Sequence, residues 1–476
     1  MDISGLTKAE AFAKLDSEMA HLEKRLLVLR NLRNTLPPIS SLPNEILAQI
    51  FLICHNLDIE PDSNGIVHWK SKTQGQTRLV LSWISHCWRI TAISYPDLWT
   101  FVPNGSTEYL QACLFRSKGL DIAVILDGPQ QRHIQQCFRE MPRIRNLHAD
   151  FSGTPDSECI DPDGAWDLHA PPLVSLSIKD MDLGEAKGDD PLFSAVHPQL
   201  RHSIIDNSDF MWDSPFVSAP TLTTLHVINP DERISVEDLV AKLQTMASLV
   251  DCKFVSCLSE PVQPHDQIHQ QLVLPNLRTL TLQQKPMTSV FALLSHLDTP
   301  NSSVYIGSDP EGLASEYFDN TFQLFHEYWY KSRYRKPDDK EPLYLSIDCH
   351  PPPTFILTVS TPVVEGTSCR FTMTIRSRIG GSIYNVPPSL SLLGPNFRTV
   401  SLNGVSSSII SFVAKFTDPR LLRITNFRGL EESGDQQQRF GGEETGLECC
   451  FSHLEELEVD GRRYNSFEEL YSSKSQ

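Results

Sequence analysis

Residues 220–227 read Pro-Thr-Leu-Thr-Thr-Leu-His-Val, and residues 275–282 read Pro-Asn-Leu-Arg-Thr-Leu-Thr-Leu. Both fit the template Pro-x-Leu-x-x-Leu-x-Leu, in which any apolar residue is accepted at the last three fixed positions. The last two apolar residues are two apart, so both point to the same face of a β-strand. One such unit cannot bury its apolar face alone, whereas a stack of units can.

The template recurs along the chain. Further copies start at Pro142, Pro171 and Pro395, two without the proline start at Ala247 and Ser452, and degraded copies start at Pro198, Thr299 and Pro419. From Pro142 to Thr299 the starts are 22 to 29 residues apart, a spacing in the range of leucine-rich repeats. Residues 236–246 and 289–297 have apolar residues at helical spacing, so strands alternate with helices. The pattern predicts parallel strands joined by crossovers in a curved solenoid.

The regularity fails between about residues 310 and 390. Residues 313–330 resemble a longer aromatic-rich helix, and three alternating strands follow, around 343–347, 355–359 and 371–375. Short connections between these strands favour hairpins over helical crossovers. We therefore expect an inserted hairpin region within the solenoid, and a flexible loop rich in Gly, Glu and Gln at 428–448.

Composition excludes several classes of protein. Of the 476 residues, 59 are acidic and 41 basic, which gives a formal charge of −18. A field of this sign repels phosphate, so we expect no nucleic-acid partner. No apolar run approaches the length of a membrane span, and charges stand where a signal peptide needs an apolar core. The 11 cysteines form no Cys-x-x-Cys pair, so neither zinc-ribbon nor thioredoxin spacing is present. Their odd number, without a signal peptide, predicts a reducing compartment, the cytoplasm or nucleus.

Residues 7–36 predict one helix that ends before Pro37 and Pro38. Apolar residues recur in a heptad seam that Arg33 interrupts; its members are Phe12, Leu15, Met19, Leu22, Leu26, Leu29 and Leu36. Two interpretations stay open. The helix forms a coiled coil that joins two copies of the protein as a homodimer, or it is an amphipathic helix that packs on its own chain.

Residues 39–102 form a compact apolar block, interrupted by a polar stretch from Asp62 to Arg78 that we interpret as a surface insertion. Within the block, Leu42 to Phe51 read LPNEILAQIF, in which Pro43 and Glu45 favour a helix start. The apolar residues that follow make a wide stripe for so short a helix. Such a stripe is covered by a partner or by the block's own helices.

This segment resembles the opening of an F-box domain, of the type found in mushroom-forming fungi, over about residues 36–102. The first half matches the family pattern at Leu42, Pro43, Glu45, Ile46, Leu47, Ile50 and Phe51. The second half, Trp83 to Thr100, matches at Cys87, Trp88, Arg89, Ala92, Pro96, Leu98 and Trp99, with one residue fewer between the cysteine and the tryptophan.

The resemblance implies a non-catalytic subunit of a Skp–cullin–F-box ubiquitin ligase, which acts in protein degradation and needs no cofactor. The F-box binds a Skp-type adaptor, and through it a cullin, while the repeat domain holds a protein substrate. The residues expected to bind the adaptor are Leu42, Pro43, Glu45, Ile46, Leu47, Ile50, Phe51, Cys87, Trp88, Arg89, Leu98 and Trp99. The alternative is a scaffold or interaction protein whose F-box-like block does not join a ligase.

Other sites are weaker on chemical grounds. His265 and His269 have the spacing of metal ligands on a helix, but prolines at 261 and 264 oppose a helix there. Residues 380–382, Gly-Gly-Ser, lack the context of a phosphate loop, and the basic and aromatic cluster at 328–336 fits a helix end. We predict no catalytic residues and no metal.

The expected fold is α/β. It comprises an N-terminal helix at 7–36, a small all-α F-box-like domain at 37–102 and an irregular leucine-rich-repeat-like domain at 103–476.

Overall fold

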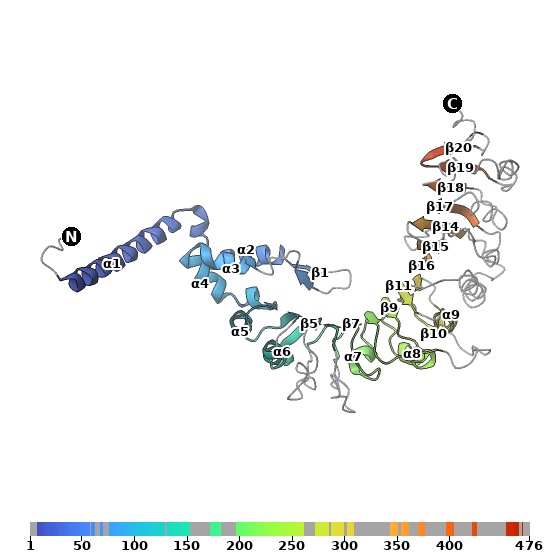
Figure 1. Cartoon of the computed structure of the whole chain (residues 1–476), viewed down its shortest axis with the longest axis horizontal. Helices are drawn as coiled ribbons and strands as arrows, with labels where there is room; N and C mark the ends of the chain where they lie inside the picture. Colours follow the sequence, from blue (N-terminus) through green and yellow to red (C-terminus); the bar gives the residue numbers. More distant parts are fainter. Residues whose placement is uncertain are drawn as a thin grey trace. The chain divides into compact units, whose positions relative to one another are not determined.

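The computed structural model of the chain describes residues 7–57, 59–61, 67–69, 76–128, 131–152, 172–181, 197–260, 272–284, 287–298, 302–308, 343–350, 354–360, 370–376, 397–403, 421–425, 454–465 and 469 (Figure 1). These residues belong to two compact units, Met1–Ser177 and Ile178–Gln476. The boundary predicted between residues 102 and 103 falls inside the first unit.

The first element is helix α1, Lys8–Thr35, which confirms the helix predicted at the N-terminus. Thr7 caps it: the Thr7 hydroxyl accepts a hydrogen bond from the Glu10 amide, and the Glu10 carboxylate accepts one from the Thr7 amide at 2.9 Å. This reciprocal pair satisfies amides that have no partner within the helix. The helix ends just before the two prolines, as the sequence predicts.

A block of short helices follows α1. Its elements are η1 Pro38–Ser41, α2 Asn44–Leu57, α3 Gln76–Ile84, α4 His86–Ser94 and η2 Pro96–Trp99, with an antiparallel pair of strands, β1 Ile59–Pro61 and β2 Val67–Trp69. Its core contains Phe51, Ala92, Leu98 and Trp99, all fully buried. The Trp99 indole donates a hydrogen bond to the Ala92 carbonyl at 2.8 Å, which satisfies its one polar group.

Arg78 joins this block to the strands that follow. Its side chain is fully buried, and its Nε donates to the Tyr109 hydroxyl at 2.6 Å. Its Nη1 donates to the carbonyls of Leu98 at 3.1 Å and Phe101 at 2.7 Å. The guanidinium carbon lies 5.2 Å from the Trp99 ring centroid and 5.1 Å from that of Tyr109. The prediction that the polar stretch up to Arg78 is a surface insertion is therefore wrong at its end, where α3 begins and Arg78 enters the core.

The strands of the first unit that follow the helical block are parallel. Strand β3 Phe101–Val102 pairs with β4 Ile122–Asp127, and β4 pairs with β5 Ile144–Asp150. Helices α5 Thr107–Arg116 and α6 Gln131–Phe138 and the turn η3 Met141–Arg143 connect them. The apolar residues of the first template copy, Ile144, Leu147 and Ala149, are buried as predicted.

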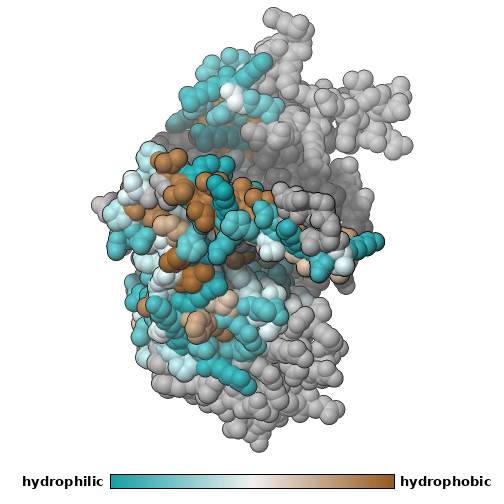
Figure 2. Space-filling model, turned by 90° about the vertical axis from the view of Figure 1, so that its left-hand side faces the viewer, coloured by the Kyte–Doolittle hydropathy of each residue, from teal (hydrophilic) through white to brown (hydrophobic). Residues whose placement is uncertain are grey.

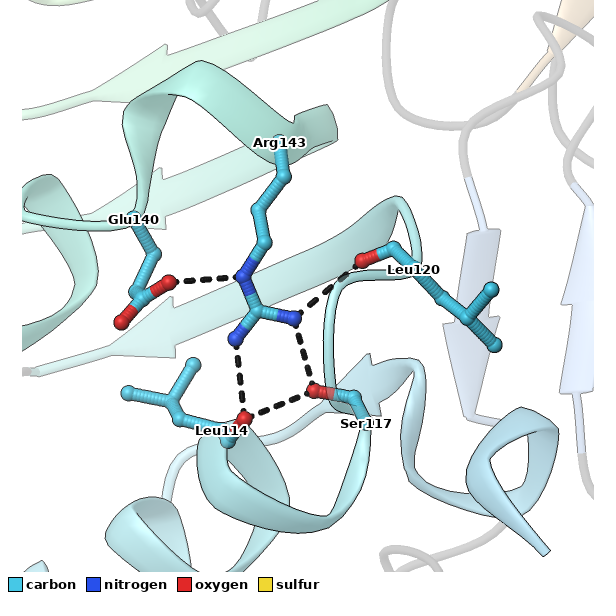
Figure 3. Close-up of polar contacts among 5 residues, drawn as sticks. All are labelled: Leu114, Ser117, Leu120, Glu140 and Arg143. Atoms are coloured by element: carbon cyan, nitrogen blue, oxygen red, sulfur yellow. Dashed lines mark hydrogen bonds and ion pairs between the residues drawn. The ribbon is translucent and has the colours of Figure 1, made fainter.

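One side chain ties η3 to the end of α5 (Figure 3). Arg143 binds the Glu140 carboxylate through Nε at 2.6 Å and donates through Nη2 to the Leu114 carbonyl at 2.9 Å. Its Nη1 donates to the Ser117 hydroxyl at 2.9 Å and the Leu120 carbonyl at 3.2 Å. The Leu114 carbonyl lies in the last turn of α5, where backbone acceptors lack partners within the helix. Arg143 therefore caps α5 from the next repeat.

Strand β6 Ser175–Lys179 contains the division between the units. In the second unit β7 His202–Asp206, β8 Thr224–Ile228, β9 Asp251–Val255, β11 Thr279–Gln283 and β13 Ser303–Ser308 pair in parallel. Helices α7 Pro215–Ser218, α8 Val236–Leu243 and α9 Met287–His296 lie on one side of these strands (Figure 1). A short parallel pair, β10 Leu272–Val273 with β12 Leu297–Asp298, accompanies them.

The strands of both units end in a recurrent way that the template does not contain. Gly128, Asp180, Asn207, Asn229 and Ser256 each directly follow a strand and have positive φ, between 46° and 55°. The amide of each donates to the last carbonyl of a later strand, as Asn229 does to Val255 at 2.8 Å. Glycine and asparagine tolerate this left-handed backbone at low cost. The turn therefore stacks one repeat on the next.

The inserted hairpin region is also confirmed at the level of the backbone. Strands β14 Leu343–His350 and β15 Thr354–Ser360, and then β15 and β16 Arg370–Arg376, pair antiparallel. Strand β16 pairs in parallel with β13, and β14 with β17 Phe397–Asn403. The stack continues with β18 Leu421–Thr425, β19 Glu456–Val459 and β20 Arg462–Tyr464. The three inserted strands thus belong to the same sheet. Between β13 and β17 they lie in the order β16, β15, β14, which is the reverse of their order in the sequence.

The α/β class, with a large parallel sheet and several helices, is confirmed. The F-box and leucine-rich-repeat assignments stay predictions. The predictions for residues 265–269, 313–330, 380–382 and 428–448, and for the cluster at 328–336, lie outside the described residues.

We predict that Arg143→Ala lowers the free energy of local unfolding of α5 by about 2 kcal/mol, because the variant removes the hydrogen bonds that Arg143 donates to Leu114, Ser117 and Leu120 at the end of the helix. Native-state hydrogen exchange of the α5 amides measures this. Arg145→Ala is the matched control, since the Arg145 side chain is exposed. Equal protection in the two variants would show that Arg143 does not hold α5.

Candidate protein-interaction surfaces

Helix α2 has two apolar stripes. Leu47, Phe51 and His55 are buried, with Ala48 beside them, and they face the block's own core. Ile46, Ile53 and Leu57 are 43%, 62% and 65% exposed. With the half-buried Ile50 they recur at spacings of four, three and four, which is the second stripe. A helix in water normally has one apolar stripe and a polar opposite face.

The next two helices also leave hydrophobic residues in water. On α3, Val80, Trp83 and Ile84 are exposed, with Trp83 at 68%. On α4, Ile90 and Ile93 are exposed. Together with the exposed members of the α2 stripe they form what we call the apolar set: Ile46, Ile53, Leu57, Val80, Trp83, Ile84, Ile90 and Ile93. Hydrophobic surface is visible among hydrophilic residues on the side of the molecule shown in Figure 2.

Contacts join α2 and α3 to α4 and so fix the positions of the three helices that carry this set. Asn44, at the start of α2, accepts a hydrogen bond from the Thr91 hydroxyl of α4 at 3.2 Å. The Cys87 thiol lies 3.8 Å from the same Asn44 oxygen. Arg89 of α4 donates to the Ser82 carbonyl of α3 at 3.0 Å. The Trp88 and Phe51 rings pack 4.9 Å apart, centroid to centroid, between α4 and α2.

The structure places part of the expected adaptor-binding set in the core of the block. Leu47, Phe51, Leu98 and Trp99 are at most 1% exposed, so their side chains are not accessible to a partner in this conformation. Their apolar side chains form the core around which the helices that carry the exposed residues pack. Pro43, Glu45, Ile46, Cys87 and Arg89 are exposed, and Leu42, Ile50 and Trp88 are half-buried. These eight stay available for contact.

Sequence reasoning missed seven members of the apolar set. Only Ile46 belongs to the family pattern, whereas Ile53, Leu57 and all the members on α3 and α4 lie outside the matched positions. A signal for them is present on α3, since Val80, Trp83 and Ile84 have the spacing of one helix face. On α2 the two stripes share the same period, so the sequence alone does not tell which one faces water.

A second surface lies on the strands of the second unit. In β7, β9 and β11 buried and half-buried residues alternate, so one face packs inward and the other is accessible. Polar groups pair on this face: His202 Nδ1 lies 3.1 Å from Thr224 Oγ1, and His226 Nε2 lies 2.7 Å from Asp251 Oδ2. His202 and Asp251 are half-buried, whereas Thr224 and His226 of β8 are buried. Lys253 and Tyr305 are half-buried on the same face. We call this surface the strand face.

Cysteine chemistry is suppressed where thiols are buried. Burial raises the pKa of Cys137 to about 12, and it also raises the pKa of Cys113, Cys252 and Cys257. These thiols stay protonated near neutral pH, and the thiolate is the nucleophilic form. Among the described residues, no group of three His, Cys, Asp or Glu side chains is placed to hold a metal ion. Within the same residues no helix is both long and apolar enough to cross a membrane.

Comparison with known proteins finds no match: no protein-family model, no curated protein and no solved structure matches this chain. Function is therefore inferred from the motif in the helical block and from the two surfaces described above.

We predict that substitutions of two neighbouring apolar residues of α2 differ in their effect on the stability of the helix. Phe51→Ala lowers the opening free energy of α2 by about 3–5 kcal/mol, because it creates a cavity in the core. Ile53→Ser changes it by less than about 0.5 kcal/mol, because Ile53 faces water. Hydrogen exchange of the α2 amides measures both. A small effect of Phe51→Ala would contradict the assignment of the inward stripe.

Proposed function

We propose that the protein is the substrate-receptor subunit of a Skp–cullin–F-box ubiquitin ligase and has no catalytic role of its own. The observation that carries this proposal is the second apolar stripe of α2. It lies within the segment that resembles an F-box, and its residues are exposed although the helix already has a buried stripe. The apolar set provides the surface for the Skp-type adaptor.

Energetics favour a protein partner for this surface. Scattered exposed hydrophobic residues are normal, but several of them on three packed helices mark an interaction site. Trp83 is suited to be its centre, because tryptophan is enriched among the residues that dominate binding energy at interfaces. Exposed Glu45 and Arg89 provide charged groups at the edge of such an interface.

The proposed division of labour assigns substrate binding to the strand face. Its polar pairs and half-buried aromatic side chain suit a protein surface of mixed polarity. A receptor accelerates ubiquitin transfer by holding its substrate near the conjugating enzyme, which turns an encounter between two molecules into a nearly unimolecular step. In this proposal the protein acts in the cytoplasm or nucleus, where a cullin ligase is available.

A second candidate follows from the burial of Leu47 and Phe51. Their role as core means that part of the motif serves the fold, so the block is also compatible with a scaffold that binds a different partner and never joins a ligase. The two candidates differ in one measurable property, which is affinity for the Skp-type adaptor.

The test is binding of the full chain to a purified Skp-type adaptor by isothermal titration calorimetry. We expect the wild type to bind and Ile53→Ser/Trp83→Ser to bind at least about thirtyfold more weakly, as expected for loss of about 2 kcal/mol at an interface centre. Phe115→Ser is the control. It removes an aromatic side chain that is 85% exposed on α5, outside the helical block, and should leave the affinity unchanged.

Circular dichroism and hydrogen exchange of α2 and α3 establish that the variants stay folded. Absence of adaptor binding by the wild type would overturn the ligase proposal and favour the scaffold. Binding that the double substitution leaves unchanged would exclude the apolar set as the adaptor site.

A further inference from the structure

Helix α1 is an unpartnered apolar surface that the proposed function does not use. Its seam residues are exposed, from 39% for Leu15 to 79% for Leu36 just past its end. Phe12, Met19 and Leu26 occupy one core position of the heptad, and Leu15, Leu22, Leu29 and Leu36 the other. In this structure the seam does not pack on the described residues of its own chain, which favours the coiled-coil interpretation.

Charges beside the seam determine which orientation two copies can adopt. The charged residues flanking it are acidic in the first half, Asp16, Glu18 and Glu23, and basic in the second half, Arg25 and Arg30; the other two flanking positions hold Ala11 and Leu32. In a parallel pair a flanking residue meets the one five positions later in the partner helix. Glu18 would then face Glu23 of the second copy, and Arg25 would face Arg30. Both contacts join like charges, which disfavours parallel pairing.

Antiparallel pairing brings the opposite charges together. When Phe12 lies opposite Leu36 of the second copy, Met19 lies opposite Leu29 and Leu22 opposite Leu26, so apolar residues meet along the seam. Arg33 falls near the end of the overlap, opposite Leu15.

In the same register the flanking residues form pairs of opposite charge: Asp16 and Glu23 approach Arg30 of the second copy, and Glu18 approaches Arg25. At the twofold axis Glu23 meets Glu23 of the second copy, and Arg25 meets Arg25. Each of these residues also lies near a residue of opposite charge, Glu23 near Arg30 and Arg25 near Glu18 of the second copy. Complementary charges at these positions set partner choice and orientation in coiled coils.

We propose that α1 is an antiparallel homodimerisation helix, whose partner is α1 of a second copy of this chain. The N-terminal end of each helix lies beside the C-terminal end of the other. The two helical blocks are then attached at opposite ends of the coiled coil, which separates the two adaptor-binding surfaces. The proposal does not depend on the ligase function, since the seam and its charges belong to α1 alone.

The test is sedimentation equilibrium of the full chain over micromolar concentrations. We expect the wild type to dimerise and Leu22→Glu, a core change at an exposed site, to be monomeric. The decisive variant reverses two flanking charges, Arg25→Glu/Arg30→Glu. It replaces the attractive antiparallel contacts of residue 18 with 25, and of residues 16 and 23 with 30, by repulsive ones, whereas both parallel contacts, 18 with 23 and 25 with 30, stay contacts between like charges. We expect its dimer dissociation constant to rise at least tenfold.

Lys24→Glu is the control, because Lys24 lies opposite the seam and its change should leave the dissociation constant within twofold of the wild type. Circular dichroism verifies that α1 stays helical in each variant. A monomeric wild type, a dimer that survives Leu22→Glu, or a control as weak as the charge-reversal variant would each overturn the proposal. A charge-reversal variant that dimerises as well as or better than the wild type would exclude the antiparallel orientation.

Discussion

The arrangement of α3, η2, β3 and α5 in the first unit depends on the hydrogen bonds that the buried guanidinium of Arg78 donates. A fully buried cation is costly unless its donors are satisfied. Arg78 has no carboxylate partner among the described residues. The Tyr109 hydroxyl accepts from its Nε, two backbone carbonyls accept from its Nη1, and two aromatic rings lie near the guanidinium, whereas its buried Nη2 donates no hydrogen bond to the described residues. Burial raises the pKa of Tyr109, so its hydroxyl stays neutral and accepts from Arg78 near neutral pH. These groups come from α3, from the segment around η2 and β3, and from α5.

Because one side chain binds all three segments, the helical block and the first parallel strand are a single packed structure. Arg116 reinforces it, with its guanidinium carbon 4.4 Å from the Trp99 ring centroid. The same packing explains why Leu98 and Trp99, which the family resemblance assigns to adaptor binding, are core residues here.

The sequence predicts the strands better than the joints between them. The template locates the buried residues of β5, β8 and β11, because side-chain period and repeat spacing are local properties. It does not contain the left-handed residues after the strands, since Gly128, Asp180, Asn207 and Ser256 share a backbone conformation but not a residue type. Arg78 was misassigned for a related reason. Composition marks it as polar, and only its partners, up to 31 residues away, make it a core residue.

The same limit applies to the hydrophobic residues that carry the functional argument. Leu47 and Ile46 are adjacent and equally apolar, yet one is 1% and the other 43% exposed. Periodicity identifies each stripe of α2 but not the direction in which it points, because that depends on where α3 and α4 pack. Once the inward stripe is assigned, the outward stripe has no role in the fold of the described block. Exposed apolar area that is costly in water and unnecessary for the core is best explained by a partner, and the seam of α1 presents the same situation with charges that also select the partner's orientation.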